Sequence, residues 1–427
     1  MTRRFLLFLI GWAGLIGAIP ATAQEPSPQL RERAEQVAAL LRGEIEPQAI
    51  FAPAFLAAVP EAQVRGVVEQ LRAQHGAVRG LEQIEPRSDH AGTLAVGMER
   101  AVLRLNLVLD AEPPHLISGL LVTGADVRDD TPAAVIEELR MLPGEVSFAI
   151  ARLGDGPPQP IAGDQADRPL AIGSTFKLWI LAELSRQVQA GDRRWSDVVT
   201  LDRRSLPSGL MQNWPSGTPV TLHTLASLMI SISDNTATDT LLHVVGRDNV
   251  ERMMATIGVA AAARNRPFLS TLELFALKTA PDDELRAWTG ADETQRRRLL
   301  ADRYADVDAA AIDPARFAGP PLRVGELEWF ASAEDLVRTM DWLRRHGDES
   351  TRAILAISPG GAPTLREDFA YVGFKGGSEP GVINLTWLVR SRAGAWHAVT
   401  GSWNDPQAPV DEARFAALMQ RALQLVR

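Results

Sequence analysis

The stretch Ala171-Ile172-Gly173-Ser174-Thr175-Phe176-Lys177-Leu178-Trp179-Ile180-Leu181 places a serine and a lysine at the start of a long apolar segment. On a helix, side chains three positions apart lie on the same face, so we expect the Lys177 amine to reach the Ser174 hydroxyl. The apolar positions that follow predict a buried helix that continues to about Ala190 and ends at Gly191, a residue suited to a C-cap. A lysine at the start of such a helix is either paired or functional.

The choice of lysine is informative because the chain uses arginine almost everywhere else. Its only lysines are Lys177, Lys278 and Lys375. Arginine cannot lose its proton in a protein, whereas a desolvated lysine can act as a base. An isolated S-x-x-K pair is nevertheless more often an ordinary helix start with a serine cap, so further motifs are needed to decide between the two interpretations.

The composition indicates a globular protein and excludes several classes. The chain has 427 residues, 46% of them hydrophobic and 23% charged, which is enough for two or three domains. Its net charge of -9 and the lack of a basic run argue against nucleic-acid binding. Because cysteine is absent, disulfides, thiol nucleophiles, cysteine-bound metals and a lipid-modified cysteine are excluded. No metal-binding cluster or nucleotide-binding glycine loop stands out, so we expect no cofactor.

Residues 1–23 have the pattern of an export signal. Arg3 and Arg4 precede the apolar run 5–19, and the small-residue site Ala21-Thr22-Ala23 follows. The run is shorter than the roughly 20 residues that a membrane span needs. We therefore expect cleavage after Ala23 and a periplasmic or secreted product without stable membrane insertion; the alternative is an uncleaved anchor.

Residues 24–128 predict a small α+β domain. Helical periodicity is followed by strand-like runs, with good alternation in 102–109. The expected helices are 29–42, 47–58 and 60–74, and the expected strands are 77–84, 92–98, 100–109 and 115–123. The order of elements is analogous to the cone of steroid-isomerase-like folds. We interpret the polar residues His75, Asp89, His90 and Asp110 as solvated turn residues and assign no chemistry to this domain.

Two further motifs follow Ser174 and Lys177 in the second domain, residues 129–427. An apolar helical segment, 222–232, runs into Ser233-Asp234-Asn235, and a strand ending at Lys375 continues into Gly376-Gly377-Ser378. S-x-x-K, S-D-N and K-x-G in this order are the signature of active-site serine enzymes that react with penicillins. The fragment 233–242 in particular resembles class A β-lactamases.

The resemblance covers roughly 131–427 and implies a fold. It implies an α/β domain in which a five-stranded antiparallel sheet carries helices on both faces. Two strands would precede Ser174, the last three would be 371–375, 383–390 and 396–403, and the helix 410–425 would pack back on the sheet. The added N-terminal domain also resembles the two-domain β-lactamase-like proteins encoded with clavulanic acid biosynthesis, through architecture alone.

The resemblance also implies roles for individual residues. Ser174 would be the nucleophile, and Lys177 would take its proton directly or through water, provided that burial and the charge of Lys375 lower the pKa of Lys177. Ser233 would bridge the two amines and deliver a proton to the leaving group, and Asn235 would hold the amide side chain of the substrate.

The carbonyl oxygen of the substrate would be held by two backbone N–H groups, those of Ser174 and Ser378. Gly377 would let the strand approach the substrate closely because it has no side chain. Lys375 would attract a substrate carboxylate.

The pattern departs from the family in two places. Gly376 stands where the third motif usually has a hydroxyl, which Ser378 would have to replace. Counting from Gly258, the glutamate and asparagine that position the deacylating water in class A enzymes fall at Phe268 and Leu272. The nearest carboxylate, Glu273, has the spacing of a capping box with Ser270, which favours a structural role.

The sequence therefore predicts an exported serine hydrolase that acts on β-lactams or related small esters and amides through an acyl-Ser174 intermediate, with slow or atypical deacylation. The alternatives are a peptidoglycan peptidase or esterase with little β-lactamase activity, and a penicillin-binding sensor that stays acylated. An extra helical segment, 281–321, is interpreted as a lid or a solvated decoration. The oligomeric state is left open.

Overall fold

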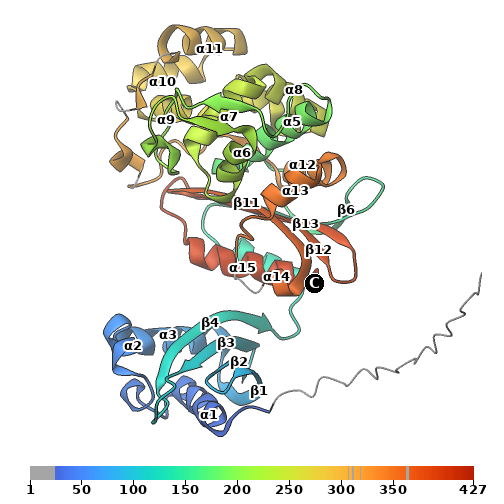
Figure 1. Cartoon of the computed structure of the whole chain (residues 1–427). Helices are drawn as coiled ribbons and strands as arrows, with labels where there is room; N and C mark the ends of the chain where they lie inside the picture. Colours follow the sequence, from blue (N-terminus) through green and yellow to red (C-terminus); the bar gives the residue numbers. More distant parts are fainter. Residues whose placement is uncertain (1–24, 306, 310–311, 318, 362–364) are drawn as a thin grey trace, which may run out of the picture. The chain divides into compact units, whose positions relative to one another are not determined.

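The chain folds into two compact units in a computed structural model (Figure 1). The structure describes residues 25–305, 307–309, 312–317, 319–361 and 365–427. One unit ends at Ala125 and the other spans Asp126–Arg427, whereas the sequence placed the boundary just before residue 129. The predicted signal segment, 1–23, lies outside the described residues. Within these ranges, no helix combines the length and the apolar character that crossing a membrane requires.

The first unit is an α+β domain, as predicted. Its sheet has the strand order β1-β2-β3-β4, and the apolar side of α1 packs on it through residues such as Leu30 and Val37. Its elements are α1 (Pro28–Arg42), η1 (Pro47–Ala49), α2 (Pro53–Ala58), α3 (Glu61–His75), β1 (Val78–Ser88), β2 (Ala91–Met98), β3 (Ala101–Leu109) and β4 (Ile117–Val127). The predicted helix 47–58 is divided in two because the backbone of Phe51 forms a β-bridge with Ile117. The likeness to a steroid-isomerase cone stays a prediction.

The second unit contains the predicted five-stranded antiparallel sheet, in the order β11-β12-β13-β5-β6. Its strands are β5 (Glu145–Leu153), β6 (Gln159–Asp164), β11 (Phe369–Glu379), β12 (Val382–Ser391) and β13 (Trp396–Asn404). Strands 145–153 and 159–164 precede the serine motif, and the other three come from the end of the chain. The edge strand β11 is the one that carries the third motif.

Helices cover both faces of this sheet (Figure 1). On one face, α4 (Pro132–Arg140) and α15 (Glu412–Gln424) bury Val135, Leu139 and Phe415 against the strands. The other face carries a larger helical layer around α5 (Lys177–Gln189), in which Leu178, Trp179 and most of the following residues are buried. This confirms the predicted fold class, with two apolar cores on either side of one sheet.

The larger layer also holds the remaining elements. They are β7 (Leu170–Ala171), β8 (Val198–Thr200), β9 (Pro219–Thr221), α6 (Leu222–Ser231), α7 (Asn235–Val245), α8 (Arg247–Ile257), α9 (Thr271–Thr279), β10 (Phe330–Ala331), α12 (Ala333–His346) and α13 (Glu349–Leu355). The short helix α14 (Leu365–Asp368) lies on the other face, where Leu365 packs in the same core as Val135 and Phe415. The described part of the segment 281–321 is helical in α10 (Asp282–Thr289) and α11 (Glu293–Leu299). Whether it acts as a lid stays a prediction.

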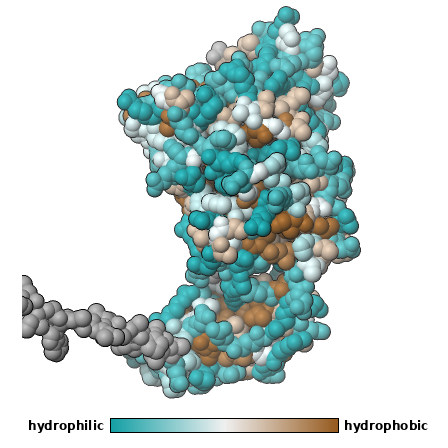
Figure 2. All heavy atoms as spheres, turned by 90° about the vertical axis from the view of Figure 1, so that its right-hand side faces the viewer, coloured by the Kyte–Doolittle hydropathy of each residue, from teal (hydrophilic) through white to brown (hydrophobic). Residues whose placement is uncertain are grey.

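The surface of the molecule is mixed. Figure 2 shows a mostly hydrophilic face with apolar patches on both units. Exposed large apolar side chains include Leu121, Met141 and Leu210. Single exposures of this kind are normal for folded proteins and carry no functional conclusion.

Candidate active site

Ser174 lies in a short 3-10 turn, Gly173–Phe176, that joins β7 to α5. The turn is fixed to the sheet by two buried asparagines that the sequence analysis missed. The backbone N–H of Ala171 donates to Oδ1 of Asn404 at 2.7 Å, and Thr175 donates to Oδ1 of Asn384 at 2.8 Å. The one signal in the sequence was an amide side chain within each strand. These contacts set the position of the serine relative to β12 and β13.

Lys177 is fully buried and points toward the second motif. Its Nζ lies 2.7 Å from the carbonyl oxygen of Ser233, 3.0 Å from Oγ of Ser233 and 2.7 Å from Oδ1 of Asn235. Among the hydrogen bonds between described residues, none joins Lys177 to Ser174. The hydrogen bonds of the amine go to the loop after α6, so the role of Lys177 as the base of Ser174, directly or through water, stays a prediction.

Ser233 stands between the two lysines of the site. Its Oγ lies 3.0 Å from Nζ of Lys177 and 3.1 Å from Nζ of Lys375. The residue has a φ of 60°, which costs a non-glycine residue about 1–2 kcal/mol. Asp234 supports this conformation, since its buried carboxylate caps α7 and accepts hydrogen bonds from the backbone N–H groups of Leu210 and Met211 at 2.7 and 2.9 Å.

The surroundings of the two lysines lower their pKa values. Burial, and then the charge of Lys375, lower the pKa of Lys177 well below its usual value, although Asp239 and Asp234 oppose this. Burial lowers the pKa of Lys375 to about 7. A neutral Lys177 amine has a free electron pair and can accept a proton. This arrangement satisfies the condition that the sequence analysis set for a lysine base.

The backbone of β11 touches the serine turn at Gly377. A Cβ atom there would lie 2.4 Å from the backbone nitrogen of Ser174, so a glycine is required. The same close approach is seen from the serine turn, where a Cβ atom on Gly173, which has a φ of 47°, would lie 3.2 Å from the backbone nitrogen of Ser378. The two backbone N–H groups expected to hold the carbonyl oxygen thus belong to segments in direct contact. Preorganised N–H pairs of this kind stabilise an oxyanion.

Asn235 is the first residue of α7 and is nearly fully buried. Its Oδ1 accepts from Lys177, and its Nδ2 donates to the carbonyl oxygen of Leu206 at 3.1 Å. An amide nitrogen has two hydrogens, so one of them is left for a substrate. Asn235 therefore orients the lysine first, and contact with a substrate amide stays a prediction.

The positions expected for the deacylating groups are packed or engaged elsewhere. Phe268 is completely buried, with its ring centre 5.7 Å from that of Phe176 and 6.1 Å from that of Trp179. Glu273 forms the predicted capping box with Ser270, and its Oε1 also accepts from Arg247 at 2.6 Å. The structural role proposed for Glu273 from the sequence is confirmed.

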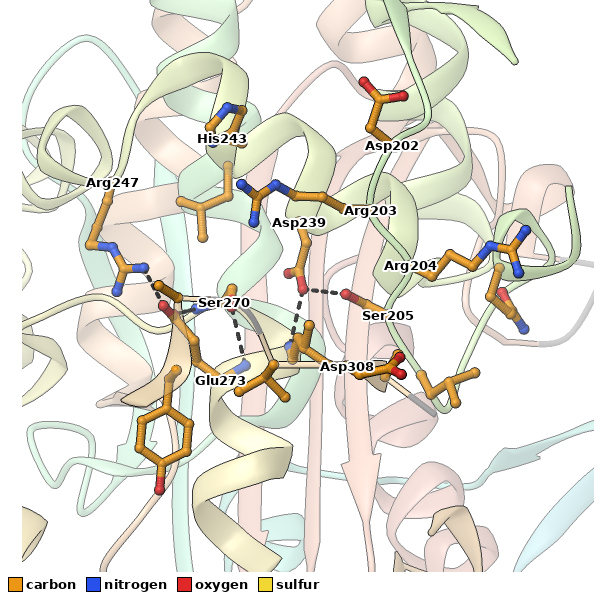
Figure 3. Close-up of a pocket in the computed structure, with 18 of the residues that line it drawn as sticks. Asp202, Arg203, Arg204, Ser205, Asp239, His243, Arg247, Ser270, Glu273 and Asp308 are labelled. Carbon is orange, nitrogen blue, oxygen red and sulfur yellow. Dashed lines mark hydrogen bonds and ion pairs between the residues drawn. The ribbon is translucent and has the colours of Figure 1, made fainter. Parts of the chain in front are cut away.

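A separate pocket of about 930 Å³ lies beside α7 (Figure 3). Its lining includes Leu206, whose carbonyl oxygen holds Asn235, but neither Ser174 nor the two lysines of the site. In Figure 3, Arg203 points toward Asp239 and His243. Cations and carboxylates are mixed along its walls, so the charge pattern selects no one class of ligand. Within the described ranges, no group of three His, Asp or Glu side chains is placed to hold a metal ion.

The five-stranded sheet with helices on both faces, and three motifs meeting beside its edge strand, define a β-lactamase-like domain. The match to the model of the "Beta-lactamase enzyme family" spans residues 133–345. The C-terminal domain of this chain belongs to that family of hydrolases. A search of curated proteins found no match.

Several solved structures are similar to this domain. A beta-lactamase from Sphaerobacter thermophilus DSM 20745 has a TM-score of 0.48 and 23% sequence identity, and the match covers 69% of this chain and 96% of that chain. PBP-A has a TM-score of 0.47 and 15% identity, over 69% of this chain and 94% of that chain. A beta-lactamase from Chitinophaga pinensis DSM 2588 has a TM-score of 0.47 and 16% identity, over 69% and 98%.

Proposed function

We propose that this protein is an exported serine hydrolase that is acylated at Ser174 by β-lactams or related small esters and amides, and that releases the acyl group slowly. The observation that carries the proposal is the meeting of Lys177 and Lys375 on the one hydroxyl of Ser233. A nucleophile, a base of lowered pKa and a hydroxyl that can pass a proton are the parts that acyl transfer requires.

In the proposed acylation, Oγ of Ser174 attacks the substrate carbonyl carbon and its proton passes to the neutral amine of Lys177. The developing oxyanion is held by the backbone N–H groups of Ser174 and Ser378. As the bond from the carbonyl carbon to the leaving nitrogen or oxygen breaks, Ser233 donates its proton to that atom and is reprotonated from Lys177. Lys375 adds a positive charge where a substrate carboxylate would bind.

Slow deacylation is supported by the side chains around the serine turn. A water molecule needs a base to attack the acyl ester, and the expected position of that base is the buried Phe268. The carboxylate of Glu273 is bound to Arg247 and to the N-cap of α9, so it is not available to replace that base.

A single experiment separates the candidate functions. The mature protein is mixed with a chromogenic cephalosporin, a simple ester and a labelled penicillin, while absorbance reports turnover and intact mass reports the adduct. Steady turnover of the cephalosporin supports a β-lactamase, and turnover of the ester alone supports an esterase or peptidase. No adduct and no turnover with any of the three would refute the proposal. Ser174→Ala is expected to abolish the adduct, and persistence of the adduct in that variant would refute the assigned nucleophile.

The second candidate is a sensor that binds penicillin and stays acylated. The packing of Phe268 against Phe176 and Trp179 favours it, because those rings fill the place of a water-activating group. A stoichiometric adduct that persists for hours with all three reagents would support this candidate over the hydrolase.

Export is proposed from residues 1–23 alone. N-terminal sequencing of the secreted or periplasmic protein is expected to begin at Gln24. A mature chain that still begins at Met1 would refute cleavage.

A further inference from the structure

A buried ionic cluster lies outside the three motifs. Lys278 of α9 contacts the carboxylates of Glu328 and Glu379, and the exposed fractions of the three side chains are 0%, 1% and 14%. Burying three ionisable groups costs free energy, and the attraction between them often does no more than offset that cost. Such a cluster is therefore weak evidence for stability, which raises the question of what else it does.

One of the carboxylates belongs to the strand that carries the oxyanion site. Glu379 is the last residue of β11 and directly follows Ser378. Because side chains alternate along a strand, Lys375, Gly377 and Glu379 share one face of it. On that face, Lys375 contacts Ser233 and Gly377 contacts the turn of Ser174.

The other carboxylate belongs to the segment that supports the serine turn. Glu328 directly precedes Trp329, whose carbonyl oxygen accepts a hydrogen bond from the N–H of Ile172 at 3.0 Å. The ring of Trp329 stacks on that of Phe176 with their centres 3.6 Å apart. Ile172 and Phe176 flank Ser174, so this segment holds the serine turn from both sides.

The pKa values of two members of the cluster are shifted by their buried surroundings. Burial, and then the charge of Glu379, raise the pKa of Glu328 well above its usual value. The pKa of Lys278 is raised because its two carboxyl partners outweigh the effect of burial. Lys278 contacts both carboxyl groups, so the three side chains form one closed ionic unit. Removing one partner would leave an uncompensated buried group, so the three side chains hold one another in place.

We propose that Lys278, Glu328 and Glu379 are positioning residues for the oxyanion site. The lysine ties the end of β11 to the segment under the serine turn, and so fixes the distance between the backbone N–H groups of Ser378 and Ser174. The cluster acts through these two backbone segments and does not touch the substrate. The inference rests on the proposed acylation of Ser174.

The test uses two triple variants of the full chain. Lys278→Met with Glu328→Gln and Glu379→Gln removes the charges at similar volume. The control, Arg421→Met with Asp130→Asn and Glu138→Gln, removes an ionic cluster on α15, at the opposite face of the sheet. Both variants are expected to fold with altered melting temperatures. The maximal rate of Ser174 acylation is expected to fall by about 10- to 100-fold in the first variant alone, which is smaller than the loss of about 100- to 1,000-fold seen when an oxyanion donor is removed outright.

Two further readouts and one further variant separate positioning from a general loss of structure. The substrate concentration at half-maximal acylation is expected to change little, because Lys375 and Asn235 are intact. The affinity for a boronic acid, whose tetrahedral adduct places an oxygen in the oxyanion site, is expected to fall in parallel with the rate. Glu379→Gln alone keeps an oxygen that can accept from Lys278 and is expected to lie between the wild type and the triple variant; it also serves if the triple variant does not fold.

The outcomes distinguish this inference from the proposed function. If the wild-type protein is not acylated by any reagent, the proposed function fails and the inference falls with it. If the wild type is acylated and the variants keep its rate and its boronate affinity, the positioning role is refuted while the proposed function stands. An equal loss of rate in the control triple variant would also refute the positioning role.

Discussion

Replacing Ser233 by alanine tests the proton path through the site. The hydroxyl lies 3.0 Å from Nζ of Lys177 and 3.1 Å from Nζ of Lys375, so its removal takes a partner from two buried amines at once. Leaving a buried polar group unpaired costs about 1–3 kcal/mol. Losing a positioned proton donor costs about 100- to 10,000-fold in rate. We therefore expect acylation by a β-lactam, whose leaving nitrogen must be protonated, to fall by about 100-fold or more.

The assay is acylation of Ser174 followed by intact mass after rapid quenching, with two substrates. One is a penicillin, and the other is an activated aryl ester whose leaving oxygen needs no proton. The ester is expected to lose much less rate than the penicillin. Ser208→Ala is the control, since that hydroxyl donates to the carbonyl oxygen of Ser233 at 2.7 Å without touching either amine.

A glycine variant separates chemistry from backbone strain. Ser233→Gly removes the same hydroxyl but relieves the cost of the φ of 60°. Both variants are expected to lose the same acylation rate, with the glycine variant the more stable of the two in chemical denaturation. Equal losses for penicillin and activated ester, or full activity in either variant, would refute proton delivery by Ser233.

Three further predictions concern pH and packing. For a substrate with a carboxylate, kcat/KM is expected to fall as the pH rises through about 7, because burial lowers the pKa of Lys375 to about 7. This fall should be absent in Lys375→Met and with an uncharged ester. A pH profile of acylation checks the prediction. Phe268→Ala is expected to lower the free energy of unfolding by about 3–5 kcal/mol without faster deacylation, as measured by denaturant titration and adduct lifetime. The raised pKa of Glu328 means that the folded protein binds the proton of this carboxyl group more tightly than the unfolded chain does. The protonated carboxyl group therefore contributes fully to stability below the usual glutamate pKa of about 4.3, and this contribution is lost as the pH rises through the folded pKa. Denaturation at several pH values should show a smaller pH dependence in Glu328→Gln.

The fold class and the meeting of the motifs could be predicted from the sequence because the signals are local. A buried amphipathic pattern, a capping residue or a glycine after a strand can be recognised within a few positions. The structure brings Lys177, Ser233 and Lys375 together as the motif order implied, and it places Gly377 against Ser174. Their catalytic roles stay predictions.

Contacts between distant parts of the chain could not be predicted. Asn384 and Asn404 bind the serine turn across 209 and 233 positions, and an asparagine in a strand gives no sign of its partner. Lys278 was recognised only as one of three lysines, because its partners lie 50 and 101 positions away. The hydrogen bonds of Lys177 to Ser233 and Asn235 could not be predicted for the same reason, because these partners come from a loop more than 50 positions away.

In the proposed reaction, the packing around the serine turn would constrain how an acyl group leaves. The ring of Phe268, at the position expected for the water-activating glutamate of a class A enzyme, packs on the edge of Phe176, which also stacks on the ring of Trp329. In the proposed reaction the remaining approach is the one that the leaving group has vacated, next to Ser233 and Lys177. By microscopic reversibility, the groups that gave a proton to the leaving atom then accept one from the incoming nucleophile. Water and any other small nucleophile would share this entrance, so the lifetime of the acyl group depends on how fast the leaving group departs and what replaces it.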